Sequence, residues 1–399
     1  MNDTKNIIYL DNNATTMVDK KVVEAMIPYF TNEFGNPSSI YELAHEAHNA
    51  LENSREVIKE FFGANDTKEI IFTSCGTESA NAAIRGVIEA NPNKRHIITT
   101  KVEHPCVLNT FKDYEEKGYR VDYLNVDENG ELLIDELKTL VDDDTALVAI
   151  MAANNETGAI YPYEEAAEIV KSINPNTKVF IDAVQAAGKI KLDVKNTKVD
   201  LMGISGHKFH APKGVGAMYI KKGTIIKPYM TGGHQERALR GGTENVPYIV
   251  GMAKAAELAM NALEFENKTV KELRDRLEEG ILENVKNAKL NSRTKMRVPN
   301  TTNIGFEYIE GELILLHLDK LGICASSGSA CTSGSLEPSH VLRAMKTPFT
   351  SLHGSIRFSL SRYTTKEEID FVVQNMPVVI KKLAKISPFQ KELAGILGE

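Results

Sequence analysis

The sequence predicts an α/β protein with two domains. The chain has 399 residues, which is more than a single hydrophobic core usually serves. From about residue 68 to 220, short apolar segments alternate with helix-like segments. This alternation is typical of a mostly parallel sheet that helices cover on both faces, and we expect right-handed crossovers between its strands.

Seven short apolar segments are expected to form the strands of this sheet. They are residues 69–73, 96–101, 120–126, 146–153, 178–183, 200–205 and 215–220. The helices expected between the first five strands cover residues 76–90, 105–118, 131–141 and 163–173. Ligands of open α/β sheets bind at the carboxyl ends of the strands. The residues that follow each strand are therefore the first place to search for a functional site.

After Pro247 the pattern changes to long helical segments and then to a mixture of strands and helices. We expect a large domain at about residues 16–260. A smaller α+β domain is expected to combine residues 1–15 with residues 261–399.

The composition excludes several classes of protein. Basic residues number 47 and acidic residues 54, so the formal net charge is -7, and no basic surplus indicates DNA or RNA binding. The first residues show no basic stretch followed by a long apolar one, and no apolar run reaches membrane-spanning length. We expect a cytoplasmic protein without a nucleic-acid or membrane partner.

The four cysteines are Cys75, Cys106, Cys324 and Cys331. A disulfide scaffold is not expected in a long chain without a secretory signal. The cysteines form no CxxC pair and no histidine cluster accompanies them, so we expect no metal site. Cys331 lies in the small, polar sequence SSGSACTSGS, which predicts an exposed loop with a reactive thiol. Cys324 ends an apolar segment and is expected to be structural.

Polar residues follow the strands at residues 69–73 and 96–101. The first strand leads into SCGTES, where a glycine and hydroxyl residues open a helix. Such a helix start can bind a phosphate, or the hydroxyl residues can simply cap the helix. The second strand leads to His104, which can stack on an aromatic ligand, shuttle protons or serve as an ordinary capping residue.

The later strands are followed by an acid and an amine. Asp182 and Gln185 come at the end of the strand at 178–183, and Lys208 follows the strand at 200–205. A carboxylate there can hold a proton on a buried ring nitrogen or cap a helix. A lysine in a dry site can bind a carbonyl, whereas most lysines are merely exposed. Together, these residues supply what pyridoxal 5'-phosphate (PLP) requires.

The chain also carries motifs that resemble a known family. In order they are YLDNNATT, FGNPSS, FTSCGTESAN, VEHP, NNETG, DAVQ, SGHKFHAPKG, RGGTEN, SSGSACTSGSLEPSHVL and IRFSLSRYTT. These motifs resemble the class V branch of fold-type I PLP enzymes, and within it the NifS/IscS-type cysteine desulfurases. The resemblance runs nearly from end to end.

The resemblance implies that the protein converts L-cysteine to L-alanine. The sulfur would be held on Cys331 as a persulfide and passed to an iron–sulfur scaffold protein or another acceptor. The catalytic residues would be Lys208, Cys331 and His104. Asn13, Asn155 and Arg357 would bind the substrate. The residues implied to bind the cofactor are Gly76, Thr77, Asn155, Asp182, Gln185, Ser205, His207, Lys208 and Thr243.

Thr243 would reach the phosphate of a neighbouring subunit, which implies a homodimer. The chain departs from the family at His210, often an aromatic residue, and at Ala211, usually a glycine. We expect only a local change in packing there.

The alternatives are a selenocysteine lyase or another class V PLP enzyme, such as an aminotransferase, and a non-catalytic sulfur carrier. An aminotransferase needs no thiol like Cys331, and a carrier needs no Lys208. A dinucleotide-binding oxidoreductase is disfavoured because no GxGxxG follows the first strand of the sheet.

Overall fold

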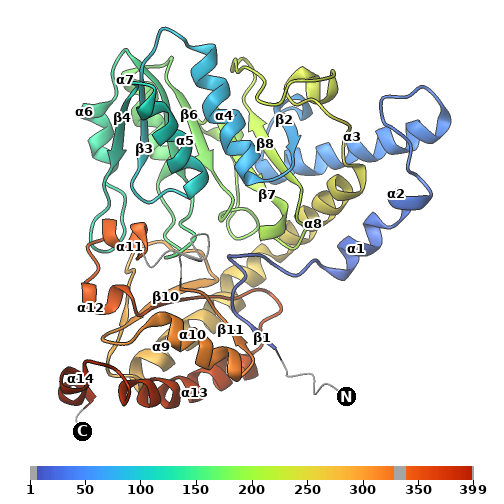
Figure 1. Ribbon diagram of the computed structural model, residues 1–399. Coiled ribbons are helices and arrows are strands. Elements are labelled where there is room, and N and C mark those ends of the chain that lie inside the picture. Colours follow the sequence, from blue (N-terminus) through green and yellow to red (C-terminus); the bar gives the residue numbers. More distant parts are fainter. Residues whose placement is uncertain (1–6, 328–337, 398–399) are drawn as a thin grey trace.

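The computed structural model describes residues 7–327 and 338–397. The protein has two parts, each built around a sheet (Figure 1). The upper part in this view contains a seven-stranded sheet, and the lower part contains a three-stranded sheet with helices packed beneath it. The N-terminal segment lies between the two parts, where it pairs with strands of the lower one.

The seven-stranded sheet has the order β2-β8-β7-β6-β5-β3-β4. Six strands run in one direction, and only β8 is antiparallel to its neighbours β2 and β7. This confirms the mostly parallel seven-stranded sheet that the sequence predicts. The strands are β2 (Ile70–Thr73), β3 (His96–Thr100), β4 (Arg120–Leu124), β5 (Thr145–Met151), β6 (Lys178–Asp182), β7 (Leu201–Ser205) and β8 (Gly216–Ile220).

The direction of β8 follows from its connection. Residues 206–215 join β7 to β8 with only a short helical turn. A parallel return needs a crossover of a dozen or more residues, whereas a short loop can join antiparallel neighbours. The loop therefore stays at the carboxyl end of β7.

Alternate residues along the strands face two different helical layers. Ile97 and Leu147 pack with the helices α4 and α5, whereas Ile98 and Val148 pack with the layer that includes α7. Both sets are buried, so the strands are apolar on both faces, as expected for a covered parallel sheet. The helices of this part are α1 (Lys20–Met26), α2 (Pro28–Thr31), α3 (Glu42–Phe62), α4 (Gly76–Ala90), α5 (Pro105–Glu116), α6 (Leu137–Leu140), α7 (Tyr163–Ile173) and α8 (Val246–Phe265).

The helix predicted over residues 131–141 is largely wrong. Only α6 is an α-helix there, after a single 3-10 turn at Ile134–Glu136. Leu132 instead forms a β-bridge with Val126. The backbone N–H of Leu133 donates to the carbonyl of Asn125, so this backbone is engaged in a turn before a helix can begin.

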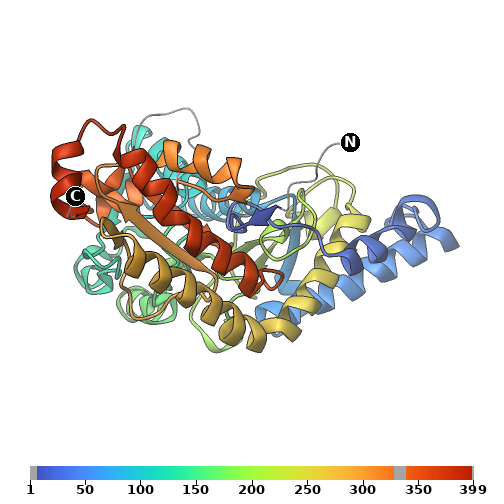
Figure 2. The same cartoon turned by 90° about the horizontal axis from the view of Figure 1, so that it is seen from below.

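The smaller part combines an antiparallel sheet of order β12-β10-β9 with the parallel pair β1–β11. Seen from below, α9 and α13 run side by side across this part (Figure 2). Ile8 and Leu10 belong to its hydrophobic core, and the domain boundaries remain a prediction. Its elements are β1 (Ile8–Tyr9), α9 (Lys271–Asn284), β9 (Ala288–Leu290), β10 (Thr301–Phe306), α10 (Gly311–Lys320), β11 (Ile323–Cys324), α11 (His340–Ala344), α12 (Phe349–Leu352), β12 (Ser355–Ser359), α13 (Lys366–Ala384) and α14 (Gln390–Leu397).

Within the described ranges, the helices are all too short or too polar to cross a membrane.

Candidate active site

A cavity of about 360 Å³ lies at the carboxyl ends of the parallel strands. Residues from several strand ends meet there with the N-terminal segment and with β12. Most of the site residues expected from the sequence line this cavity. They are Asn13, Gly76, Thr77, His104, Asn155, Asp182, Gln185, Ser205, His207, Lys208 and Arg357.

Two expected site residues are not in this group. Thr243 is exposed and lines a separate hollow beside Arg240 and Glu244. Cys331 lies outside the described residues, so its position relative to the cavity remains a prediction. Cys324, expected to be structural, is half-buried in β11, and burial raises the pKa of its thiol.

One end of the cavity suits an anion. Helix α4 begins at Gly76, and the side chain of the capping residue Cys75 makes no hydrogen bond to its first turn. A Cβ added to Gly76 would meet Cγ2 of Val184 at 2.7 Å, so only glycine allows this close approach. The buried hydroxyl of Ser205 has no hydrogen-bond partner among the described residues. Backbone N–H groups and a hydroxyl thus point to a phosphate site.

Asp182 supplies a buried carboxyl group. It is the last residue of β6 and accepts a 2.9 Å hydrogen bond from the backbone N–H of Val184. Burial raises the pKa of Asp182 to about 6, although that hydrogen bond and Lys208 act in the opposite direction. A buried carboxylate is strongly stabilised in its charged form by a cationic partner, such as a protonated ring nitrogen.

His104 caps helix α5 with its ring. Its Nδ1 accepts a hydrogen bond from the backbone N–H of Cys106 at 3.2 Å, so the proton of the neutral ring lies on Nε2. Burial lowers the pKa of His104 to about 4, with further lowering by Lys208 and His340. Burial also raises the pKa of the Cys106 thiol, which lies 3.0 Å from Nδ1. The cavity is therefore lined by a neutral imidazole and a protonated thiol.

Lys208 lies in the turn that follows β7. Its Nζ donates hydrogen bonds to the carbonyl oxygens of Asn13 at 2.6 Å and Ala14 at 2.9 Å. The same Asn13 carbonyl accepts a 3.0 Å hydrogen bond from Nε2 of Gln185. The N-terminal segment thus holds the lysine and the glutamine on one wall of the cavity.

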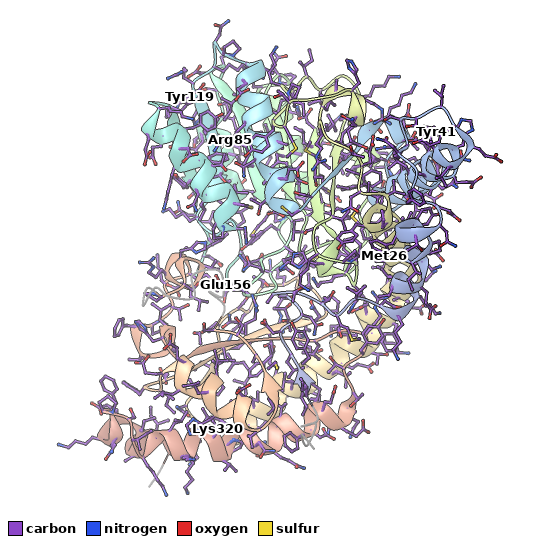
Figure 3. All side chains as sticks on the ribbon, turned by 45° about the vertical axis from the view of Figure 1, so that its right-hand side comes forward. Met26, Tyr41, Arg85, Tyr119, Glu156 and Lys320 are labelled. Carbon is purple, nitrogen blue, oxygen red and sulfur yellow. The ribbon has the colours of Figure 1, made fainter. Side chains whose placement is uncertain are left out.

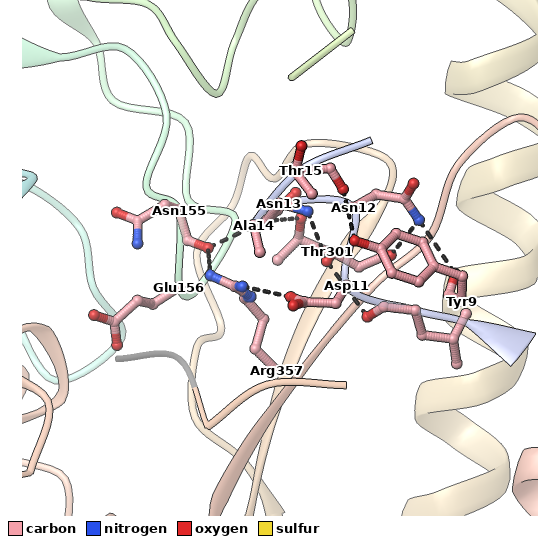
Figure 4. A network of polar contacts seen from close by, with 12 residues as sticks. Tyr9, Asp11, Asn12, Asn13, Ala14, Thr15, Asn155, Glu156, Thr301 and Arg357 are labelled. Carbon is pink, nitrogen blue, oxygen red and sulfur yellow. Dashed lines mark hydrogen bonds and ion pairs between the residues drawn. The ribbon is translucent and has the colours of Figure 1, made fainter. Parts of the chain in front are cut away.

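Arg357 on β12 forms the wall on the side of the smaller part (Figure 4). Its guanidinium donates to the carbonyl oxygen of Asn155 at 3.0 Å and to the Asp11 carboxylate at 2.7 Å. The Nε of Arg357 is buried and has no hydrogen-bond partner in the described ranges. Asn13 also donates to the Asn155 carbonyl. A fixed guanidinium of this kind suits a carboxylate ligand.

His210 and Ala211 sit outside the cavity lining, in the turn after Lys208. His210 adopts a left-handed backbone with φ of 72°, and its Nδ1 lies 2.9 Å from the carbonyl of Met17. Ala211 is buried against Gly206: a Cβ added to Gly206 would lie 3.0 Å from the Ala211 Cβ. Both residues are packed in place beside the lysine turn.

Two buried ionisable residues near the cavity are missed by sequence reasoning. Glu103 accepts hydrogen bonds from Thr100 Oγ1 and the backbone N–H of Met151, and burial raises its pKa to about 8. Lys189 is buried behind Gln185. Glu103 lies inside the VEHP motif and Lys189 follows the DAVQ motif by four residues, yet nothing in the sequence marks either as buried.

These features fit a phosphorylated pyridine aldehyde. The cavity offers an amine for the aldehyde, a carboxyl group for the ring nitrogen, a flat neutral imidazole and a phosphate cradle. The fold and this arrangement define a PLP enzyme of fold type I.

Comparison with known proteins agrees with this class. The family model for aminotransferase class-V matches residues 8–372, and the chain belongs to this family. It is 55% identical over 392 residues to a cysteine desulfurase of Trichormus azollae, covering 98% of this chain and 97% of that one. It is 50% identical to the cysteine desulfurase NifS of Azotobacter vinelandii, covering 96% and 94% of the two chains.

A solved structure of a NifS-like protein has the same fold. It superimposes with a TM-score of 0.89 at 42% identity, covering 94% of this chain and all of that one.

Proposed function

We propose that the protein is a cysteine desulfurase that converts L-cysteine to L-alanine. The observation that carries this proposal is the convergence of Lys208, Asp182, His104 and Arg357 on one cavity. Two related proteins with the name cysteine desulfurase cover nearly the whole chain, which supports the same reaction.

The PLP site uses the residues around this cavity. Lys208 would bind the aldehyde, Asp182 the ring nitrogen and Gln185 the ring hydroxyl, while His104 would stack on the ring. The phosphate is assigned to Thr77, Ser205, His207 and the first turn of α4, and to Thr243 of a second subunit. When bound, PLP supplies an electron sink that makes the substrate Cα–H bond acidic.

The protein's own groups bind the substrate and move its protons. Arg357, together with Asn155 and Asn13, orients the substrate carboxylate. The Lys208 amine takes the proton from Cα. The same amine can then donate this proton to another reacting atom, because it is fixed beside the reacting atoms. We assign the exchange of the substrate thiol proton to Nε2 of His104.

Cys331 is the proposed sulfur acceptor. Its thiolate attacks the substrate sulfur, so that an S–S bond forms while the C–S bond breaks. The electron pair of the broken bond stays on the three-carbon fragment, which takes up a proton and leaves as alanine. The sulfur then passes from Cys331 to a scaffold protein for iron–sulfur clusters or to another acceptor.

The described residues on both sides of this cysteine lie beside the cavity. Ser326 exchanges two backbone hydrogen bonds with Arg357. On the other side, Ser339 donates to Glu156, which Figure 3 shows at the junction of the two parts. The adjacent His340 contacts the backbone carbonyl of Glu103 through Nε2 at 2.9 Å. These contacts support the assignment of Cys331 to this cavity.

We also propose a homodimer in the cytoplasm. Several large apolar side chains around α2 and before α3 are exposed. They lie where the part with the seven-stranded sheet extends outward (Figure 3). Thr243 is exposed as well. A second copy that covers such a surface would bury apolar area. The exposed residues are Ile27, Phe30, Phe34, Ile40 and Tyr41.

The decisive experiment measures alanine and sulfide released from L-cysteine in the presence of a thiol reductant. The wild-type protein should release both in equal amounts, and Cys331→Ala should release neither while it keeps its yellow colour. A wild-type protein that is yellow but forms neither product is a PLP enzyme with another substrate. The same assay with L-selenocysteine distinguishes the lyase alternative.

A further inference from the structure

We propose that Lys189 is a positioning residue of the cofactor site, which orients the Gln185 amide and places a positive charge behind Lys208. This inference rests on the proposed function, because it concerns the same site. Lys189 lies outside every motif assigned above, and its side chain does not line the main cavity.

The structure connects Lys189 to the cavity through a continuous set of hydrogen bonds. Lys189 is 6% exposed, and its Nζ donates to the Gln185 side-chain oxygen at 3.1 Å and to the Gln185 backbone carbonyl at 3.2 Å. Gln185 Nε2 donates to the Asn13 carbonyl at 3.0 Å. The same carbonyl accepts the hydrogen bond from Lys208.

These contacts determine which way the Gln185 amide faces. The Lys189 amine donates to the Gln185 side-chain oxygen at 3.1 Å, so the amide oxygen faces Lys189. A backbone carbonyl only accepts, so the amide nitrogen must face Asn13. The second N–H of that nitrogen is left for the cavity that Gln185 lines. Gln185 is thereby held as a hydrogen-bond donor toward the cavity, where it would favour the anionic form of the ring hydroxyl.

The arrangement differs from that of a buried lysine in an ordinary salt bridge. Both hydrogen-bond acceptors of Lys189 in the described chain belong to Gln185. The nearby Glu266 forms its ion pair with Arg362 at 3.6 Å. Lys189 therefore donates its hydrogen bonds to Gln185, which faces the cavity, and not to a carboxylate.

The charge of Lys189 also acts on Lys208. Burial lowers the pKa of Lys189 to about 7, and Lys208 and Arg357 lower it further while Glu266 opposes them. Repulsion between two cations is mutual, so a charged Lys189 disfavours an added proton on the Lys208 nitrogen. The charged groups that face Lys189 are Lys208 after β7, Glu266 after α8, Arg357 on β12 and Arg362 after β12. The rings of His207 and His210, in the turn after β7, also face it.

The test compares Lys189→Met with Lys191→Met, a control two residues away on the exposed surface. The measurements are the dissociation constant of PLP and the pH at which the visible absorbance of the PLP-loaded protein changes. That absorbance reports protonation at the Lys208 nitrogen. Loss of Lys189 should weaken PLP binding about tenfold and move the absorbance change about one pH unit upward, whereas Lys191→Met should match the wild type.

Lys189→Gln separates the two roles and serves if Lys189→Met does not fold. It retains a hydrogen-bond donor but no charge, so it should restore part of the PLP affinity while the absorbance change stays shifted. If Lys189 variants only lower the melting temperature and leave both measurements unchanged, the residue is structural and the inference is wrong. A wild-type protein that gains no visible absorbance with PLP overturns the proposed function itself.

Discussion

The Nζ of Lys208 lies 2.6 Å from the carbonyl oxygen of Asn13, a residue 195 positions earlier in the chain. The contact ties the turn after β7 to the N-terminal segment. It also keeps the amine at the cavity wall, where Asp182 and Gln185 complete the set of groups assigned to PLP. The first prediction concerns this amine.

Lys208→Ala should lose both the yellow colour and the reaction. The variant lacks the only amine that we assign to the PLP aldehyde, and it lacks the group that moves the Cα proton. Loss of the base alone costs about 100- to 10,000-fold in rate. Absorbance spectra after PLP loading, together with alanine release, test this. A variant that turns over cysteine at the normal rate would refute the assignment.

Arg357→Lys should impair substrate binding more than cofactor binding. The guanidinium holds Asn155 and Asp11 through two different nitrogens, and an ammonium cannot copy that fork. Loss of one charge-assisted hydrogen bond corresponds to about 10- to 100-fold in kcat/KM. We expect the rise in KM to exceed the fall in kcat, with an unchanged PLP spectrum as the control. An unchanged KM would place the substrate carboxylate elsewhere.

Glu236→Gln should destabilise the fold. Both carboxylate oxygens of Glu236 lie 2.8 Å from guanidinium nitrogens of Arg55, and one of them also accepts from the backbone N–H of Phe72. Breaking a buried ion pair on one side costs about 3–5 kcal/mol of unfolding free energy. Urea denaturation measures this cost.

Glu52→Gln is the matched control, since it contacts the same arginine from the surface. The Glu52 side chain is 44% exposed, and exposed pairs contribute only about 0.2–1 kcal/mol. Equal losses for the two variants would contradict the prediction.

Glu103→Gln should change how stability depends on pH. The pKa of Glu103 is raised from 4.5 to about 8 in the folded protein, so the folded state keeps a proton that the unfolded state releases between these values. Wild-type stability is therefore lost as pH rises through this window, by at most about 1.4 kcal/mol per pH unit. Glutamine does not titrate, so the variant should gain stability relative to wild type from pH 5 to pH 8.

Urea denaturation at both pH values checks the sign. Glu128→Gln, at an exposed position, should show no such change relative to wild type. A stability difference between Glu103→Gln and wild type that does not depend on pH would show that Glu103 is ionised throughout.

Much of the fold follows from local sequence patterns. The seven strands are short apolar segments between helix-like ones, and all seven are present. The pattern is less informative at residues 131–141, where apolar spacing suits a helix but the backbone of Leu133 is bound to Asn125. This pairing spans only eight residues, and the Asn129-Gly130 turn between its partners is the local signal that the helix prediction overlooks.

The site residues were predictable where a motif marks them, as with Lys208 and Asp182. Burial of a charged side chain is a property of the assembled fold, so neither Glu103 nor Lys189 could be recognised in advance. The same holds for the pairing of Arg357 with Asp11, since these two residues come from opposite ends of the chain. Thr243 is the one marked residue that the structure describes outside the cavity.

The contacts between the N-terminal segment and β12 also determine when the cavity can be completed during synthesis. Lys208, Asp182 and His104 leave the ribosome long before Arg357, whereas Asn12 and Asn13 are held in place by the backbone carbonyl and hydroxyl of Ser359. A nascent chain that stops short of β12 can thus build the parallel sheet with its cofactor-facing loops, but Asn12 and Asn13 still lack their partner Ser359. Pairings this distant in sequence are slow to form. The final enclosure of the cavity consequently requires β12, so a chain truncated before β12 should retain PLP weakly even when its large sheet is complete.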